Sequence, residues 1–188
     1  EGHEHEGKDE EAHGVDPHVW FNVQHVIHWV QRIETVLSEH DPAGRAHYAA
    51  NARRYAAELE ELDRWIQDQI DKIPPGRRVL VTNHPAFGYF AERYGLRQIG
   101  AIYPVNPSSE PSAQGLAALE DAIREFDVPA VFAESTVNPK LAEQVARDTG
   151  VRLVPLYTGS LGGPDSGAAT YLEMMRHNVR AMVEALAD

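Results

Sequence analysis

Apolar side chains recur every three or four positions through the first third of the chain, which is the spacing of an amphipathic helix. This spacing predicts one helix from Phe21 to about Ser38, ended by Asp41-Pro42. A second, longer helix is predicted from about Gly44 to Ile73, where two prolines and a glycine stop it. About thirty residues at 1.5 Å each give a rod of roughly 45 Å, which is longer than most helices inside a compact domain.

From Gly76 onward the pattern changes to short apolar runs that alternate with helical stretches. The predicted strands span residues 79–82, 97–102, 130–133 and 151–157. The predicted helices span residues 86–94, 112–126 and 170–186, and a further one begins at Asn138-Pro139. Strands that alternate with helices indicate a parallel sheet that is buried on both faces. We therefore expect an α/β fold, a four-stranded parallel sheet flanked by helices and preceded by a long linking α-helix.

Composition and charge narrow the functions that this fold could serve. The 188 residues carry a net charge of −12 and are 43% hydrophobic, which is typical of an acidic globular protein. This charge argues against nucleic acid and anionic membranes as main partners, because both bind basic surfaces. The chain contains no cysteine, so a metal site would need imidazole or oxygen ligands. No apolar run approaches the length of about 18 residues that predicts a transmembrane helix.

Residues 1–15 are charged and almost devoid of apolar side chains, a composition that predicts a mobile tail. His3, His5 and His13 lie in this tail among acidic residues. Histidine-rich stretches bind divalent cations, so the tail is a candidate accessory tract that gathers metal. A solvated acidic leader without a ligand is the alternative.

Three polar residues stand where the predicted fold would present them to a ligand. His84 lies at the carboxyl end of the first predicted strand and Glu134 at the end of the third. Ligands of open α/β sheets bind at this edge. His18 follows Asp16-Pro17, and because the proline restricts the backbone, this histidine sits on a defined corner. An imidazole in such a position can bind a metal, transfer a proton or make a hydrogen bond in the core.

Two motifs resemble those of a known protein family. Asp16-Pro17-His18-Val19-Trp20 and, about 65 residues later, His84-Pro85-Ala86-Phe87-Gly88-Tyr89-Phe90 resemble the metal-binding substrate-binding proteins of ABC transporters for zinc and manganese. The resemblance runs from about Gly14 to the end of the chain and implies that His18 and His84 are metal ligands. It also implies the domains: a remnant of an amino-terminal lobe (16–42), a long helix that links two lobes (43–75) and a carboxyl-terminal α/β lobe (76–188).

The resemblance implies two further ligands, and the sequence departs from the family pattern at both. One is a histidine of the amino-terminal lobe, because the resemblance covers only the carboxyl-terminal two-thirds of a family member. The other is commonly an aspartate, but Gly159 takes its place in Leu156-Tyr157-Thr158-Gly159-Ser160-Leu161. Asp165, Glu134 and water are the candidate substitutes, and Glu134 could instead support another ligand from behind. Pro85 also replaces a common aspartate, which removes a group that could orient His84.

The resemblance implies a receptor, not an enzyme, that delivers a divalent metal to the membrane permease of an ABC transporter. Its location would be periplasmic or otherwise extracytoplasmic, with lipid anchoring through the missing amino-terminal part as one option. Imidazole ligands favour Zn²⁺, whereas oxygen ligands favour Mn²⁺. Zinc is therefore the expected metal and manganese the alternative.

Two functions of other classes are the competing hypotheses. One is a zinc-dependent hydrolase, although the sequence contains neither His-Glu-x-x-His nor Gly-x-Ser-x-Gly, which carry hydrolytic chemistry in known enzymes. The other is an adhesion module, which could use the same scaffold because a fold does not fix a function.

Overall fold

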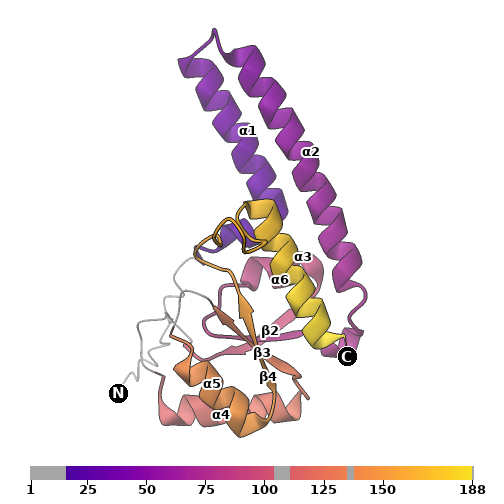
Figure 1. The fold of residues 1–188 in the computed structure, drawn as a ribbon, viewed down its shortest axis with the longest axis vertical. Helices are drawn as coiled ribbons and strands as arrows, with labels where there is room; N and C mark the ends of the chain where they lie inside the picture. The colour runs from indigo at the N-terminus through magenta and orange to yellow at the C-terminus, as the bar shows by residue number, and fades with distance from the viewer. Residues whose placement is uncertain (1–15, 104–110, 135–137, 188) are drawn as a thin grey trace, which may run out of the picture.

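Figure 1 shows the fold of the chain in a computed structural model that describes residues 16–103, 111–134 and 138–187. A short 3-10 helix, η1 (Val19–Phe21), leads into two long helices, α1 (Val23–His40) and α2 (Arg45–Ile70). These two helices form a hairpin that projects beyond the rest of the molecule (Figure 1). Across the described ranges, none of the helices has both the length and the apolar character that a membrane crossing requires.

The sequence predicted α2 to continue to Ile73, but the helix ends at Ile70. The residue before a proline avoids the helical backbone, so Pro74 turns the chain out of the helix at Ile73. The carbonyl oxygen of Ile73 instead accepts a hydrogen bond from Nε of Arg78 at 3.0 Å. Ile73 is nevertheless fully buried. The apolar residues that predicted α2 therefore continue into the buried segment that follows the helix.

Four parallel strands form the sheet, which confirms the predicted α/β fold. They are β1 (Val79–Thr82), β2 (Arg97–Ala101), β3 (Ala130–Glu134) and β4 (Arg152–Leu156), in the order β2-β1-β3-β4. The remaining helices are η2 (Pro75–Arg77), α3 (Gly88–Tyr94), α4 (Ala113–Glu125), α5 (Lys140–Thr149) and α6 (Tyr171–Leu186).

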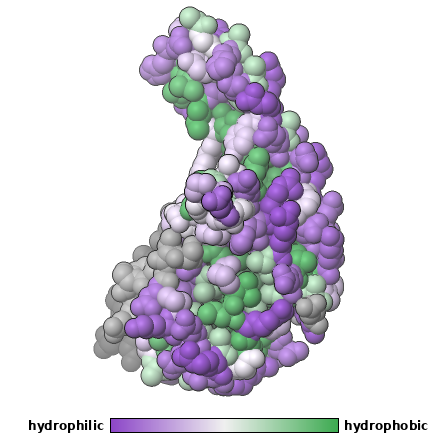
Figure 2. All heavy atoms as spheres, in the orientation of Figure 1, coloured by the Kyte–Doolittle hydropathy of each residue, from purple (hydrophilic) through white to green (hydrophobic). Residues whose placement is uncertain are grey.

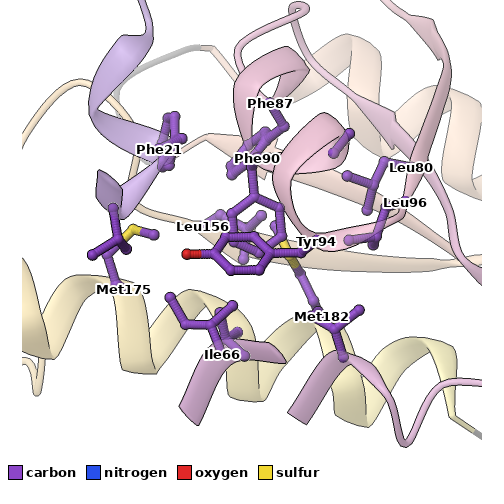
Figure 3. Close-up of a cluster of buried hydrophobic side chains, with 14 of the residues drawn as sticks. Phe21, Ile66, Leu80, Phe87, Phe90, Tyr94, Leu96, Leu156, Met175 and Met182 are labelled. Carbon is purple, nitrogen blue, oxygen red and sulfur yellow. The ribbon is translucent and has the colours of Figure 1, made fainter. Parts of the chain in front are cut away.

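Helices cover both faces of the sheet (Figure 1). Successive side chains of a strand point to opposite faces, so each strand contributes to two cores. On one face, Val81 and Val131 pack with apolar residues of α4 and α5. On the other face, Leu80 and Phe132 pack with residues of α2, α3 and α6. Figure 3 shows this second core, in which Tyr94 lies among side chains from several of these elements.

The strand order contains one switch point. β1 connects through α3 to the edge strand β2, whereas β3 connects through α5 to the opposite edge strand, β4. The chain thus leaves the centre of the sheet in opposite directions after β1 and after β3. Open α/β sheets bind their ligands in the crevice outside the carboxyl ends of two such strands. His84 follows the end of β1, and Glu134 is the last residue of β3.

A single buried amide fixes α6 to the end of β4. Oδ1 of Asn178 accepts a hydrogen bond from the backbone N–H of Tyr157 at 2.9 Å, and Nδ2 donates to the carbonyl oxygen of Tyr157 at 2.6 Å. The Asn178 side chain thus satisfies both backbone groups of the residue that follows β4. Because Thr158 and Gly159 come next, this amide also fixes the backbone that enters the candidate site.

We expect Asn178→Ala to lower the free energy of unfolding by about 2–3 kcal/mol, because it leaves the N–H and C=O of Tyr157 without these partners. Urea unfolding followed by circular dichroism measures the change. Asn51→Ala is the matched control, since the Asn51 amide bonds the His47 side chain at the exposed surface. Its effect should stay below about 0.5 kcal/mol. Equal losses for the two variants would contradict the role of Asn178.

Candidate metal centre

His18 is held in a fixed orientation by the aspartate two residues before it. Oδ1 of Asp16 accepts a hydrogen bond from the backbone N–H of His18 at 2.9 Å and lies 2.7 Å from the ring nitrogen Nδ1. An aspartate that bonds the backbone two residues further on closes an Asx turn. Pro17, between the two residues, restricts the backbone further. The turn and the ring contact leave Nε2 as the free nitrogen of the His18 imidazole.

His84 is held in a similar way, but by a residue of the neighbouring strand. Its Nδ1 forms a hydrogen bond with Oε1 of Glu134, and the hydroxyl of Thr158 donates to the other carboxylate oxygen, Oε2, at 2.5 Å. The hydroxyl of Thr82 donates to the carbonyl oxygen of His84 at 2.7 Å. Glu134 is 4% exposed and His84 is 8% exposed. The buried carboxylate thus fixes the His84 ring between β1, β3 and the segment after β4.

The free nitrogens of the two rings face each other, with Nε2 of His18 3.0 Å from Nε2 of His84. An ionised carboxylate only accepts hydrogen bonds, so the network assigns the proton of each neutral ring to the Nδ1 that faces a carboxylate. Each Nε2 then carries a lone pair, and the two lone pairs repel each other. A cation between the two nitrogens, either a proton or a metal ion, removes this repulsion.

The spacing of the two nitrogens fits a metal ion. Two nitrogens bound to one tetrahedral zinc at about 2.0–2.1 Å lie about 3.3 Å apart, within a few tenths of an ångström of the observed separation. Histidines that bind metals usually donate their other ring N–H to a carboxylate or carbonyl group, as both rings do in this site. In the part of the chain that the structure describes, no three His, Cys, Asp or Glu side chains are grouped to hold a metal. The described residues therefore provide half of a tetrahedral ligand set.

The structure brings the two predicted ligands His18 and His84 together, and it distinguishes among the other candidates. Glu134 lies behind His84 with both of its oxygens engaged, which favours the supporting role over direct ligation. Asp165 is exposed in the segment between β4 and α6, and Gly159, also exposed, offers no side chain. The candidate accessory residues His3, His5 and His13 lie outside the described residues.

Two groups that complete the supports of the histidines, Asp16 and Thr158, are not among the residues expected from the sequence. Asp16 was considered only for the proline that follows it, although an aspartate two residues before a polar residue at a corner is a recognisable Asx-turn signal. No sequence signal identifies Thr158 as a donor to Glu134, because their contact depends on β4 lying beside β3.

We expect Glu134→Gln to weaken zinc binding about 10–100-fold, because a neutral amide orients and polarises the His84 ring less than a carboxylate does. Competition with a chromogenic zinc chelator measures the affinity. Glu143→Gln is the matched control, since Glu143 forms its ion pair within α5, with Arg147 at 3.9 Å. An unchanged affinity for Glu134→Gln would show that His84 binds metal without help from this carboxylate.

Sequence comparisons agree with this geometry. The model of the family described as "Zinc-uptake complex component A periplasmic" matches residues 1–185. The manganese-binding lipoprotein MntA of Halalkalibacterium halodurans is 40% identical over 180 residues, which cover 95% of this chain and 60% of that protein. The iron-binding protein YfeA of Yersinia pestis is 34% identical over 175 residues, which cover 93% of this chain and 56% of that protein.

Solved structures share the fold. The periplasmic zinc-binding protein TroA of Treponema pallidum matches with a TM-score of 0.85 at 30% identity, over 92% of this chain and 64% of that one. A Mn-bound periplasmic metal-binding protein of Candidatus Liberibacter asiaticus matches with a TM-score of 0.83 at 28% identity, over 94% and 65%. The chain thus spans less than two-thirds of the length of these relatives. Since the family model covers almost all of it, the chain belongs to the family of metal-binding substrate-binding proteins of ABC transporters.

Proposed function

We propose that this chain is part of a receptor outside the cytoplasm that binds a divalent metal ion and passes it to the membrane permease of an ABC transporter. The observation that carries the proposal is the pair of imidazole Nε2 atoms 3.0 Å apart, each ring backed by a carboxylate. The family description names a periplasmic component, and the name of one relative includes the word lipoprotein. Both names support a location outside the cytoplasm, with a lipid anchor in the amino-terminal part of the whole protein.

A receptor accounts for the site better than a zinc-dependent hydrolase does. A metal hydrolase needs a base or nucleophile beside the bound metal and its water. Glu134 is the buried carboxylate of the site, but its two oxygens are engaged by His84 and Thr158. Oδ1 of Asp16 is engaged by the backbone N–H and the ring of His18. Both carboxylates therefore orient the two histidine rings and are not placed to activate a water molecule. This arrangement suits reversible binding of a cation.

Zinc is the cargo that we propose. Two nitrogen ligands, with glycine at position 159 where the family commonly has an aspartate, suit Zn²⁺ better than Mn²⁺. Manganese is the second candidate, because a relative that is 40% identical is named a manganese-binding lipoprotein. Other relatives are named for iron and for zinc. The names support a divalent transition metal in general, and the nitrogen donors support zinc among them.

We propose that the remaining ligands come from an amino-terminal lobe that packs on the projecting hairpin. One flank of α1 exposes large apolar side chains: Trp29, Ile33, Val36 and Leu37. Ile33, the most exposed of them at 58%, lines a groove of about 320 Å³ between α1 and α2 together with Tyr48 and Tyr55. Figure 2 shows hydrophobic surface on this part of the hairpin. Exposed apolar surface marks an interaction site, and the greater length of the relatives supports a lobe of the same protein as its occupant.

His84→Ala should weaken zinc binding by more than about 100-fold, because losing a ligand costs more than the 10–100-fold typical of a group behind a ligand. His28→Ala is the control, since His28 is exposed on α1. Both affinities come from competition with a chromogenic chelator, and light scattering reports whether zinc bridges two molecules. Equal affinities for the two variants would remove His84 from the proposed site.

Gly159→Asp should raise the affinity for both metals and raise it more for Mn²⁺ than for Zn²⁺, because it adds an oxygen ligand to a nitrogen-only pair. Gly163→Asp adds the same charge in the same loop, where a side chain would meet no atom within 4 Å. Calorimetric titration of both variants with each metal measures the change in selectivity. An equal increase in metal affinity in the two variants would be a general effect of the added charge. Position 159 would then not be a ligand position.

A further inference from the structure

Asp63 is a buried carboxylate on α2 that lies outside the metal centre. It is 6% exposed, and three side chains from two other helices donate hydrogen bonds to it. The donors are Gln24 of α1 (Nε2, 2.8 Å), Arg93 of α3 (Nη2, 2.5 Å) and Tyr94 of α3 (hydroxyl, 2.7 Å). The hydrogen bonds to the Asp63 carboxylate therefore connect α1 and α3 to α2.

The Asp63 carboxylate is ionised in this position. Burial by itself would raise the pKa of Asp63, but the hydrogen bonds from Arg93, Tyr94 and Gln24 outweigh burial and lower the pKa below its ordinary value. Hydrogen bonds to an ionised acceptor are stronger and more directional than those between neutral groups. The Asp63 carboxylate therefore holds its three donors more firmly than an amide or a hydroxyl in the same place would.

Each donor lies on the first α-helix after one of the two histidines. α1 begins at Val23, five residues after His18, and Gln24 lies in its first turn. α3 begins at Gly88, four residues after His84, and Arg93 and Tyr94 are its last two residues. A movement of α1 relative to α3 therefore moves one histidine relative to the other.

Aromatic packing connects the same two segments. Phe21 contacts Phe87 with ring centroids 4.4 Å apart, Phe87 contacts Phe90 at 6.1 Å, and Phe90 contacts Tyr94 at 4.8 Å. Figure 3 shows this row of rings, which begins three residues after His18 and ends at a donor to Asp63. Apolar packing of this kind keeps the segments together, and the charged hydrogen bonds add a directional constraint between them.

We infer that Asp63 is a positioning residue that sets the separation of His18 and His84. The inference rests on the proposed function and on the domain division that the family resemblance implies, in which α1 belongs to one lobe, α3 to the other, and α2 links them. Asp63 is then the joint between the lobes, placed on the linking helix. When this joint is weakened, the two Nε2 atoms separate, and a metal ion is held by one imidazole rather than by two.

The test compares the unsubstituted chain with Asp63→Asn, which keeps the shape of the side chain and removes its charge. Zinc affinity is measured by chelator competition, and the visible absorption spectrum of bound Co²⁺ reports how many nitrogens bind. We expect Asp63→Asn to lower the affinity at least about 10-fold and to shift the Co²⁺ spectrum toward that of His84→Ala. Asp71→Asn is the control, since Asp71 is the residue that directly follows α2 and pairs with Arg78 at 3.3 Å. It should change neither quantity.

A double variant separates positioning from a general loss of stability. If Asp63 acts through the histidine pair, adding Asp63→Asn to His84→Ala costs little further affinity, because the pair is already broken. Additive losses would overturn the inference. Circular dichroism checks folding, and if Asp63→Asn does not fold, Tyr94→Phe replaces it by removing one donor and leaving the Arg93 ion pair.

Failure of the inference and failure of the proposed function give different results. No binding of zinc or cobalt by the unsubstituted chain would overturn the proposed function, and with it this role of Asp63. Binding by the unsubstituted chain, with the same affinity and the same Co²⁺ spectrum in Asp63→Asn, would overturn the role of Asp63 alone.

Discussion

The candidate site depends on holding the Nε2 atoms of two imidazole rings 3.0 Å apart. With the Nδ1 protons assigned to the sides that face the carboxylates, each Nε2 carries a lone pair. Two lone pairs at this distance repel each other, so other interactions must hold the rings in place. The carboxylates behind the rings supply these interactions, because each accepts a hydrogen bond from Nδ1–H and so fixes both the tautomer and the orientation of its ring. The repulsion is the reason that the site attracts a cation, and the rigidity of the surrounding fold is the reason that the rings do not simply turn away.

The supports of the two rings have different origins. Asp16 supports His18 from two residues away, so that half of the site is fixed by a local turn. Glu134 supports His84 from a neighbouring strand, so that half requires the assembled sheet. The family resemblance implies an aspartate where Pro85 stands, and Glu134 of the neighbouring strand β3 contacts the His84 ring instead. Folding of the sheet and formation of the metal site are therefore one event for the second histidine.

These origins also explain what the sequence could predict. Strand 79–82 was predicted to the residue, because a short apolar run bounded by polar residues has few alternatives. The end of α2 was misplaced because Ile73 is buried without being helical. The two histidines were found from motifs and from their places at element ends. The direction of Glu134 depends on β1 lying beside β3, which hydrophobic periodicity does not specify. Asp63 is one of several acidic residues on α2, and only the packing of α1 and α3 distinguishes it.

The pairing of each neutral imidazole with an ionised carboxylate has an electrostatic consequence. With both carboxylates ionised and both rings neutral, Asp16, His18, His84 and Glu134 together carry two negative charges, which a bound divalent ion would balance. A monovalent ion would leave the group anionic and a trivalent ion would make it cationic, and a net charge is costly where the surroundings are largely buried. Loading therefore removes a local electric field. Under the proposed function, a permease that faces this edge of the sheet distinguishes a loaded receptor from an empty one by that field, before any change in shape.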